Sequence, residues 1–96
     1  MPVIRHFADS DNEKLFRGQT PRKLSKQILH HALRKLLVLD AAESLEDPRI
    51  PPGNRLEKLR GNRKGQYRIR INDQWRICFE WRNGDAYAVE ITDYHS

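Results

Sequence analysis

The chain has little sulfur and no long apolar run, and both shortages limit what it can be. Its single cysteine, Cys78, excludes an intrachain disulfide framework and a zinc site built from several cysteines. No stretch approaches the roughly 18–20 apolar residues of a membrane-spanning helix. The start of the chain, MPVIRHFADSD, lacks the apolar segment of a secretory signal. We therefore expect a cytoplasmic protein that does not act at a membrane.

Length and composition predict one small folded domain. The chain has 96 residues, so we expect a single domain, residues 1–96, around one small core. Only 38% of the residues are hydrophobic and 32% are charged. The apolar residues nevertheless recur in periodic runs, which favours a folded domain over a disordered chain.

The net charge of +5 is distributed unevenly. Residues 55–76 hold eight basic side chains against two acidic ones, and residues 14–35 hold seven basic side chains and no acid. Two basic surfaces on a small domain suggest a polyanion, an acidic protein partner, or both. A solvated surface that keeps the protein soluble explains the charge equally well, so charge alone does not decide.

Two helices are expected in the first half of the chain. Asp9 or Ser10 can cap the first helix, and Gly18 is suited to end it. Thr20-Pro21 is a second start signal, and the helix that it opens should run to about Val38. One broad face of this helix is apolar and comprises Leu24, Ile28, Leu29, Ala32, Leu33, Leu36 and Leu39. The opposite face is basic and carries Lys23, Lys26, His30 and Arg34.

Alternating apolar and polar residues predict three strands in the second half. They are Gln66–Ile71, Gln74–Arg82 and Ala86–Thr92, with hairpin turns at Asn72-Asp73 and Asn83-Gly84-Asp85. The inward set should comprise Tyr67, Ile69, Ile71, Trp75, Ile77, Phe79, Trp81, Tyr87, Val89 and Ile91. The outward set should include Arg68, Arg70, Arg76, Glu80 and Glu90. Shorter strands are expected at Val3–Phe7 and Leu56–Leu59.

The second half also carries a long motif. It comprises Leu56, Leu59, Gly61, Arg63, Gly65, Tyr67, Ile69-Arg70-Ile71-Asn72, Trp75-Arg76-Ile77 and Phe79, then Glu90 and Asp93-Tyr94-His95. This motif resembles the HigB toxins, a branch of the RelE/ParE-like superfamily of bacterial type II toxin–antitoxin systems, and the resemblance extends over essentially the whole chain. It implies an α+β, RelE-like fold in which two N-terminal helices pack on a twisted, mainly antiparallel sheet of four or five strands.

The resemblance also implies an activity and its partners. HigB toxins cut mRNA in the ribosomal A site, so we expect a ribosome-dependent endoribonuclease that needs neither a metal nor another cofactor. The expected partners are the ribosome, mRNA and a HigA-type helix-turn-helix antitoxin. The antitoxin would neutralise the toxin and repress the shared operon, so operator DNA would be contacted only through the antitoxin.

Metal-free RNA cleavage requires an acid, a base and cations around the reacting phosphate. His95 is the first candidate for acid or base, because its ordinary pKa of about 6.5 permits both roles. Tyr94 could stack on a base or donate to a phosphate oxygen, and Asp93 could orient a neighbour. The alternatives are a frayed terminal histidine and a tyrosine that closes the edge of the core.

Arginines are the candidates for phosphate contact. Arg60, Arg63 and Arg76 are expected to bind phosphate and stabilise transition-state charge, because the guanidinium offers a planar fork of donors. For Arg68 and Arg70, ordinary strand surface is at least as good an explanation. Lys58 is the least certain member of this set.

Glu57 departs from the family pattern. Some HigB toxins have a histidine in this segment. A carboxylate could serve as a general base, or it could pair with Arg60 or Arg76. Both readings stay open on the sequence.

Two other functions are compatible with the expected fold, and one face of the protein is expected to bind the antitoxin. A gyrase-directed, ParE-like toxin would share the fold without cutting RNA. A plain RNA-binding regulator is disfavoured because it usually exposes aromatics on the sheet face, whereas the strand aromatics here share the inward phase. The antitoxin is expected to dock on the basic helical face formed by Lys23, Lys26 and Arg34.

Overall fold

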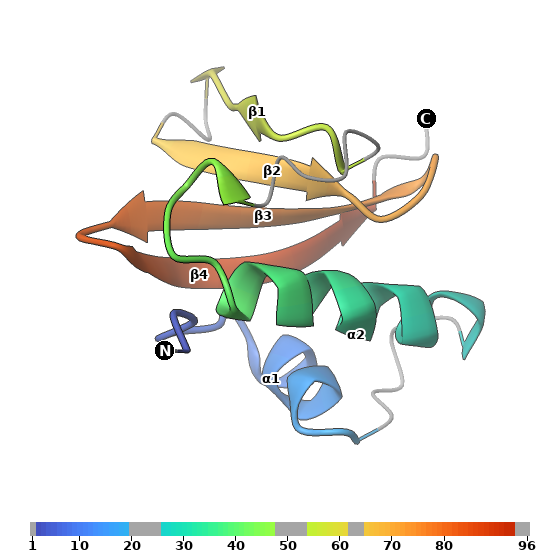
Figure 1. Ribbon diagram of the computed structural model, residues 1–96. Helices are drawn as coiled ribbons and strands as arrows, with labels where there is room; N and C mark the ends of the chain where they lie inside the picture. Colours follow the sequence, from blue (N-terminus) through green and yellow to red (C-terminus); the bar gives the residue numbers. More distant parts are fainter. Residues whose placement is uncertain (1, 20–25, 48–53, 62–64, 94–96) are drawn as a thin grey trace.

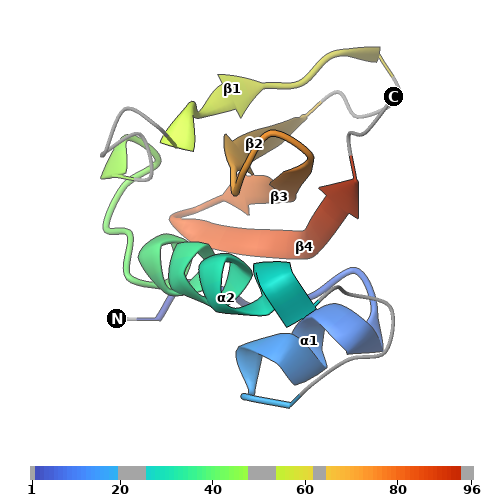
Figure 2. The same cartoon turned by 90° about the vertical axis from the view of Figure 1, so that its right-hand side faces the viewer.

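Four antiparallel strands and two helices form two layers in the computed structural model, which describes residues 2–19, 26–47, 54–61 and 65–93 (Figure 1). The elements are α1 Ser10–Phe16, α2 Lys26–Asp40, β1 Glu57–Lys58, β2 Gln66–Arg70, β3 Trp75–Arg82 and β4 Asp85–Asp93. The strands pair in the order β1-β2-β3-β4. Both helices lie on the same side of the sheet (Figures 1 and 2). This arrangement confirms the predicted α+β fold.

Helix α1 has the ends that the sequence predicts. A side-chain oxygen of Asp9 accepts from the backbone N–H of Asn12 at 2.9 Å, which makes Asp9 the N-cap. At the other end Gly18 has φ +86°, a left-handed conformation that suits glycine. The N–H groups of Gly18 and Gln19 then bond to the carbonyls of Leu15 and Lys14 at 3.0 and 2.8 Å. These two bonds form a Schellman cap that terminates the helix.

Helix α2 packs its predicted apolar face against the sheet. Its buried members among the described residues are Ile28, Ala32, Leu36 and Leu39. The helix continues past Val38 to Asp40. The Oδ1 of Asp40 accepts from the N–H groups of Val3 and Ile4 at 3.1 and 2.9 Å. The predicted start at Thr20-Pro21 lies outside the described residues. In the described segments, neither helix has the length and apolar character needed to cross a bilayer.

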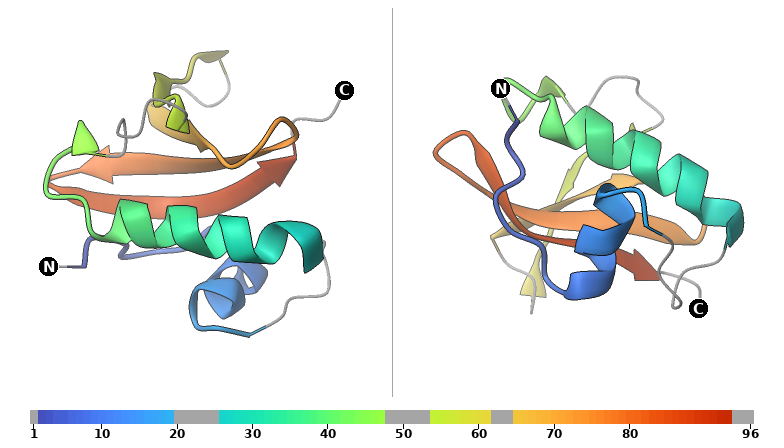
Figure 3. Two further views of the ribbon diagram at one scale, coloured as in Figure 1. Left: turned by 45° about the vertical axis from the view of Figure 1, so that its right-hand side comes forward. Right: turned by 90° about the horizontal axis from the view of Figure 1, so that it is seen from below.

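The N-terminal segment does not form the expected strand. Val3–Phe7 makes two isolated bridges, Ile4 to Ala86 and Phe7 to Val89, both parallel to β4 (Figure 3). Asp40 accepts from the N–H groups of Val3 and Ile4, whereas the N–H groups of Arg5 and Ala8 donate to the Ala86 and Val89 carbonyls of β4, both at 2.9 Å. The sheet of the described chain therefore has four strands.

The turns and inner face of the sheet follow the sequence over most of their length. Asn83 and Gly84 both have positive φ, 52° and 82°, as a type I′ hairpin requires. The fully buried side chains on the helix side of the sheet are Ile69, Ile77, Phe79, Ala86 and Val89. Phe79 lies at the centre of an aromatic group, with its ring 6.1 Å from that of Tyr67 and 6.4 Å from that of Trp81.

Strand β4 breaks the predicted alternation at a bulge. Cys78 pairs with Glu90, but Glu80 pairs with Tyr87, so β4 contains one extra residue between these pairs. Ala88 occupies the bulge with φ +52°, and its N–H bonds to Nδ1 of His6 at 3.2 Å. Between Ala88 and the Asn83-Gly84 turn, the side chains of β4 therefore point to the faces opposite to those that strict alternation predicts. Ala86 is buried in the core as a result, and the prediction that Tyr87 points inward is wrong.

The bulge makes a prediction for two substitutions of Ala88. Ala88→Gly should raise the free energy of unfolding by about 0.5–1 kcal/mol, because glycine adopts a positive φ without the Cβ clash. Ala88→Val should lower it by about 1–3 kcal/mol, since a branched side chain is strained there. A regular strand would give the opposite order, because strands favour valine over glycine. Chemical denaturation decides, and a valine variant more stable than the glycine variant would contradict the bulge.

Candidate functional site

The face of the sheet that points away from the helices, here called the outer face, carries the predicted basic residues in two rows. The first row crosses all four strands and comprises Glu57, Arg68, Cys78 and Glu90. The second row crosses β2, β3 and β4 and comprises Arg70, Arg76 and Thr92. The outward phase predicted for the three strand arginines is therefore confirmed, and antiparallel pairing brings all three together.

Arg76 is fixed by the turn that precedes it. Its Nη1 donates to the backbone carbonyls of Asn72 and Trp75, the latter at 3.1 Å. The Asn72 side chain shapes this turn, since its Oδ1 accepts from the N–H groups of Gln74 and Trp75 at 2.9 and 2.8 Å. A guanidinium held by backbone carbonyls keeps its full charge, because these acceptors carry none.

The rows bring three arginines together beside two carboxylates, Glu57 and Glu90, and the arginines repel one another. Partial burial lowers the pKa of the Arg76 guanidinium below its ordinary value, and the charges of Arg68 and Arg70 lower it further. Glu57 opposes this shift. Arginine nevertheless stays charged at neutral pH, so the repulsion remains in the folded protein. A bound polyanion would relieve this repulsion, which makes the outer face a candidate phosphate site.

Glu57 forms an ion pair with Arg68, which was not among its predicted partners. Its Oε2 lies 2.8 Å from Nη2 of Arg68, because the β1–β2 register places the two residues opposite each other. The partners considered on the sequence were Arg60 and Arg76. The Glu57 side chain is still 51% exposed. It therefore remains accessible at the edge of the rows.

The other predicted phosphate contacts are less centrally placed. Arg70 forms an ion pair with Asp73 in the β2–β3 connection. Lys58 is exposed and lies opposite Tyr67, one position out of phase with Glu57. Arg60 is exposed just beyond β1, and Arg63 lies outside the described residues. Lys58 and Arg60 thus extend the basic surface at the sheet edge and are not members of the two rows.

The described part of β4 ends at Asp93, at the Arg76 end of the outer face. Asp93 is exposed, lies opposite Trp75, and accepts from Nε2 of Gln74 at 3.3 Å. The residue before it, Thr92, pairs with Arg76. Tyr94 and His95 lie outside the described residues.

Lys35 is a basic residue near the site that sequence reasoning missed. Its Nζ donates to Oδ1 of Asn54, a fully buried side chain just before β1. Burial lowers the pKa of Lys35, and Arg34 and Arg70 lower it further. The contact joins α2 to the segment that leads into β1. No local periodicity could have revealed it, because it depends on how α2 packs across the sheet.

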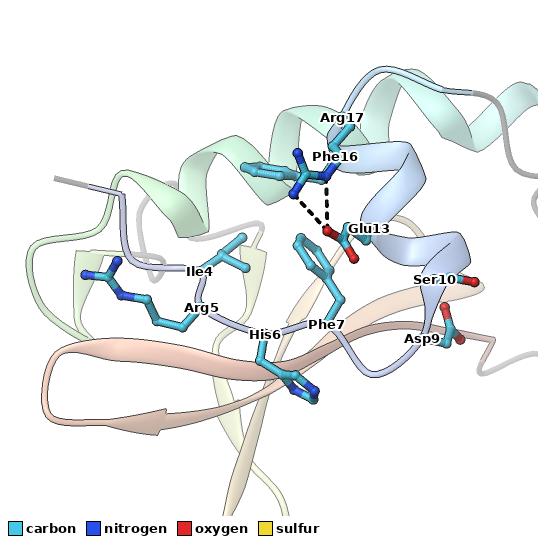
Figure 4. A pocket seen from close by; sticks show the side chains of 9 residues that line it. All are labelled: Ile4, Arg5, His6, Phe7, Asp9, Ser10, Glu13, Phe16 and Arg17. Carbon is cyan, nitrogen blue, oxygen red and sulfur yellow. Dashed lines mark hydrogen bonds and ion pairs between the residues drawn. The ribbon is translucent and has the colours of Figure 1, made fainter.

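Two of the hollows among the described residues differ in their relation to the rows. One, of about 550 Å³, is lined by the N-terminal segment and α1 (Figure 4). Its walls combine the Phe7–Phe16 ring pair with the Glu13–Arg17 ion pair, and it shares no residue with the two rows. The other, of about 310 Å³, is lined by Trp75 and Asp93 and also by Glu90 and Thr92, one member of each row. Within the described ranges, no three His, Cys, Asp or Glu side chains are grouped as a metal site requires.

Known proteins resemble this chain over nearly its whole length. Residues 5–95 match the family described as RelE-like toxin of type II toxin-antitoxin system HigB. Toxin HigB-1 of Vibrio cholerae serotype O1 is 44% identical over 81 residues, which cover 83% of this chain and 85% of the relative. An uncharacterized protein of Haemophilus influenzae is 32% identical over 92 residues, covering 95% and 90%. Endoribonuclease HigB of Proteus vulgaris is 44% identical over 41 residues, covering 43% and 45%. The chain therefore belongs to the HigB-like family of RelE-like toxins of type II toxin–antitoxin systems.

Proposed function

We propose that this toxin is a ribosome-dependent endoribonuclease that cuts mRNA in the A site without a metal and thereby inhibits translation. The observation that carries the proposal is the cluster of Arg68, Arg70 and Arg76 on the outer face, with Arg76 paired with Thr92 near the described end of β4. The name of the Proteus vulgaris relative, an endoribonuclease, supports the same activity.

The chemistry follows from the charge of the rows. The 2′-hydroxyl of the RNA attacks the adjacent phosphate, its proton leaves to a base, and the 5′-oxygen departs with a proton from an acid. Negative charge grows on the phosphate oxygens as the phosphorane forms. Arg76, with Arg68 and Arg70 beside it, places fixed positive donors where this charge develops, and such donors are often the largest catalytic contribution. Arg60, Arg63 and Lys58 would hold neighbouring phosphates.

Proton transfer is assigned to the C-terminal residues. His95 is the acid or base, Tyr94 stacks on a base or donates to phosphate, and Asp93 orients a neighbour. Glu57 is one of the two carboxylates of the first row, with Glu90. Its ion pair with Arg68 favours a role in positioning that arginine. The pair uses Oε2 alone, so a general-base role stays an alternative that substitution of Glu57 can test.

Production of the chain without its antitoxin is expected to arrest growth by cutting translated mRNA. Northern analysis of a well-translated message should show shortened products within minutes of induction, whereas a copy of that message without a start codon should stay whole. An Arg76→Ala variant is the matched control and should leave the message intact. Growth arrest with whole mRNA and damaged DNA would instead support a gyrase-directed toxin.

Membership of a type II system implies a cognate antitoxin. A HigA-type helix-turn-helix protein would dock on the basic helical face. Arg34 is exposed on α2, while Lys23 and the Lys26 side chain lie outside the described residues. The helices pack on one side of the sheet (Figure 2), the side of the buried Ile69, Ile77 and Phe79, and the strand arginines have the opposite phase. An antitoxin on the helices would therefore leave the rows uncovered and would block entry into the ribosome by its bulk.

Reversing the charge of Lys23 and Lys26 to glutamate should slow antitoxin association. We expect a decrease of about tenfold or more at low salt, because opposite charges on the two partners steer their encounter. The difference should shrink as salt screens the charges. Stopped-flow mixing measures the rate, and ribonuclease activity of the free variant should be unchanged. Equal association rates for variant and wild type would place the interface elsewhere.

A further inference from the structure

The bulge in β4 turns an aromatic ring to the outer face. Because Tyr87 pairs with Glu80, and Glu80 pairs with Gln66, the three residues form a third row at the far end of the outer face. Glu80 has the same phase on β3 as Arg76, four residues away. At about 3.4 Å per residue, the third row lies roughly 14 Å from the Arg76 row. A few nucleotides of single-stranded RNA span such a distance.

The Arg82 guanidinium lies over this ring. Its Cζ is 4.1 Å from the centroid of the Tyr87 ring, and its Nε is 3.7 Å from Oε1 of Glu80. The guanidinium therefore contacts both the ring and a carboxylate. The Arg82 side chain is nevertheless 61% exposed. A further planar group can stack on the pair, and RNA bases stack in this way on aromatic rings and on guanidinium planes.

We propose that Arg82 and Tyr87 form a stacking platform for one RNA base, a few nucleotides from the phosphate held at Arg76. The platform deepens the proposed ribonuclease function and rests on it for RNA as the ligand. Glu80 stands beside the stack. A carboxylate accepts hydrogen bonds from the amino groups of cytosine and adenine but repels the carbonyl oxygen of uracil. The platform therefore favours a base that carries an exocyclic amino group.

Direct binding of RNA tests the platform without cleavage. The probe is a short fluorescent single-stranded RNA that is 2′-O-methylated throughout, so that the nucleophile is absent. Anisotropy titrations compare wild type with Tyr87→Ala, Tyr87→Phe, Arg82→Gln and Leu37→Ala. Leu37 is exposed on α2, on the opposite side, and serves as the matched control. Thermal melts of each variant establish that the comparison is between folded proteins.

Tyr87→Ala should weaken binding by about 5- to 100-fold, the range for loss of one stacked base. Tyr87→Phe keeps the ring and should stay within about twofold of wild type, and Leu37→Ala should match wild type. Arg82→Gln should also weaken binding and reduce its salt dependence. Probes with one abasic position then locate the base: at that position wild type loses affinity and Tyr87→Ala does not. Equal affinity of Tyr87→Ala and wild type, or a loss that no abasic position removes, would overturn the platform.

Ribosome complexes identify the source of the base. If an abasic mRNA position removes the difference in affinity between wild type and Tyr87→Ala, mRNA supplies the base. If the difference in affinity survives at every mRNA position, ribosomal RNA supplies it. Different results would contradict the platform and the proposed ribonuclease function. Weaker RNA binding by Tyr87→Ala together with intact mRNA in wild-type reactions would remove the ribonuclease and keep the platform. Cleavage by wild type together with unchanged binding by Tyr87→Ala would do the reverse.

Discussion

Replacing Arg76 by alanine is expected to lower the rate of mRNA cleavage on ribosomes by at least about 100-fold. Removal of one positioned donor from a site of developing negative charge typically has an effect of this size. Arg76 is the best-placed donor, because the carbonyls of Asn72 and Trp75 fix its guanidinium and the charges of Arg68 and Arg70 reinforce its field. Single-turnover assays with saturating toxin report the chemical step.

One further variant separates the charge of Arg76 from the planar geometry of its guanidinium, and a second serves as a control. Arg76→Lys keeps the charge but loses the planar pair of donors, so an intermediate rate is expected. Arg17→Ala removes the exposed C-cap arginine of α1, which pairs with Glu13 far from the rows in sequence, and this variant should cut at the wild-type rate. A folded Arg76→Ala variant with wild-type rate would remove Arg76 from the catalytic assignment.

Replacing His95 by alanine is expected to lower cleavage by at least about 100-fold as well, because a positioned acid or base contributes roughly 10²–10⁴-fold. The pH dependence assigns its role. If His95 is the base, the wild-type rate falls as pH drops through the imidazole pKa, ordinarily about 6.5; if it is the acid, the rate falls as pH rises through it. That limb should be missing in His95→Ala. A wild-type rate in this variant would refute the assignment.

Glu57→Gln tests whether Glu57 acts as the general base. The Glu57 carboxylate is paired with Arg68, so we expect less than about a tenfold loss. A loss of 100-fold or more would make Glu57 the general base. It would also remove the limb of the pH profile that belongs to a carboxylate, whereas a positioning role would leave the profile unchanged.

The sequence predicted those features that depend on local chemistry. The Asp9 cap, the Gly18 terminus and the Asn83-Gly84 turn each follow from what one or two residues do to the backbone. The outward arginines follow from the period of two in the strands. In the candidate site, the period of two therefore predicted that Arg70 and Arg76 share the outer face. Their proposed roles in RNA cleavage came from the family resemblance.

Features that depend on long-range packing were not predictable. The bulge at Ala88 leaves no mark in the apolar pattern, so Tyr87 was placed on the wrong face. Val3–Phe7 has the pattern of a strand, but Asp40 takes two of its N–H groups. The Lys35–Asn54 contact and the Glu57–Arg68 pair both require the register between elements. Register between distant segments is a property of the assembled core.

Primer extension on mRNA from a translating extract, with and without this protein, tests the central claim most directly. New 5′ ends that fall within codons occupying the A site, present only when the message is translated and absent with Arg76→Ala, are the predicted result. Chelation of divalent cations after ribosome complexes are assembled and stabilised should leave the cut in place. Intact mRNA in the presence of folded wild-type protein would contradict ribosome-dependent cleavage.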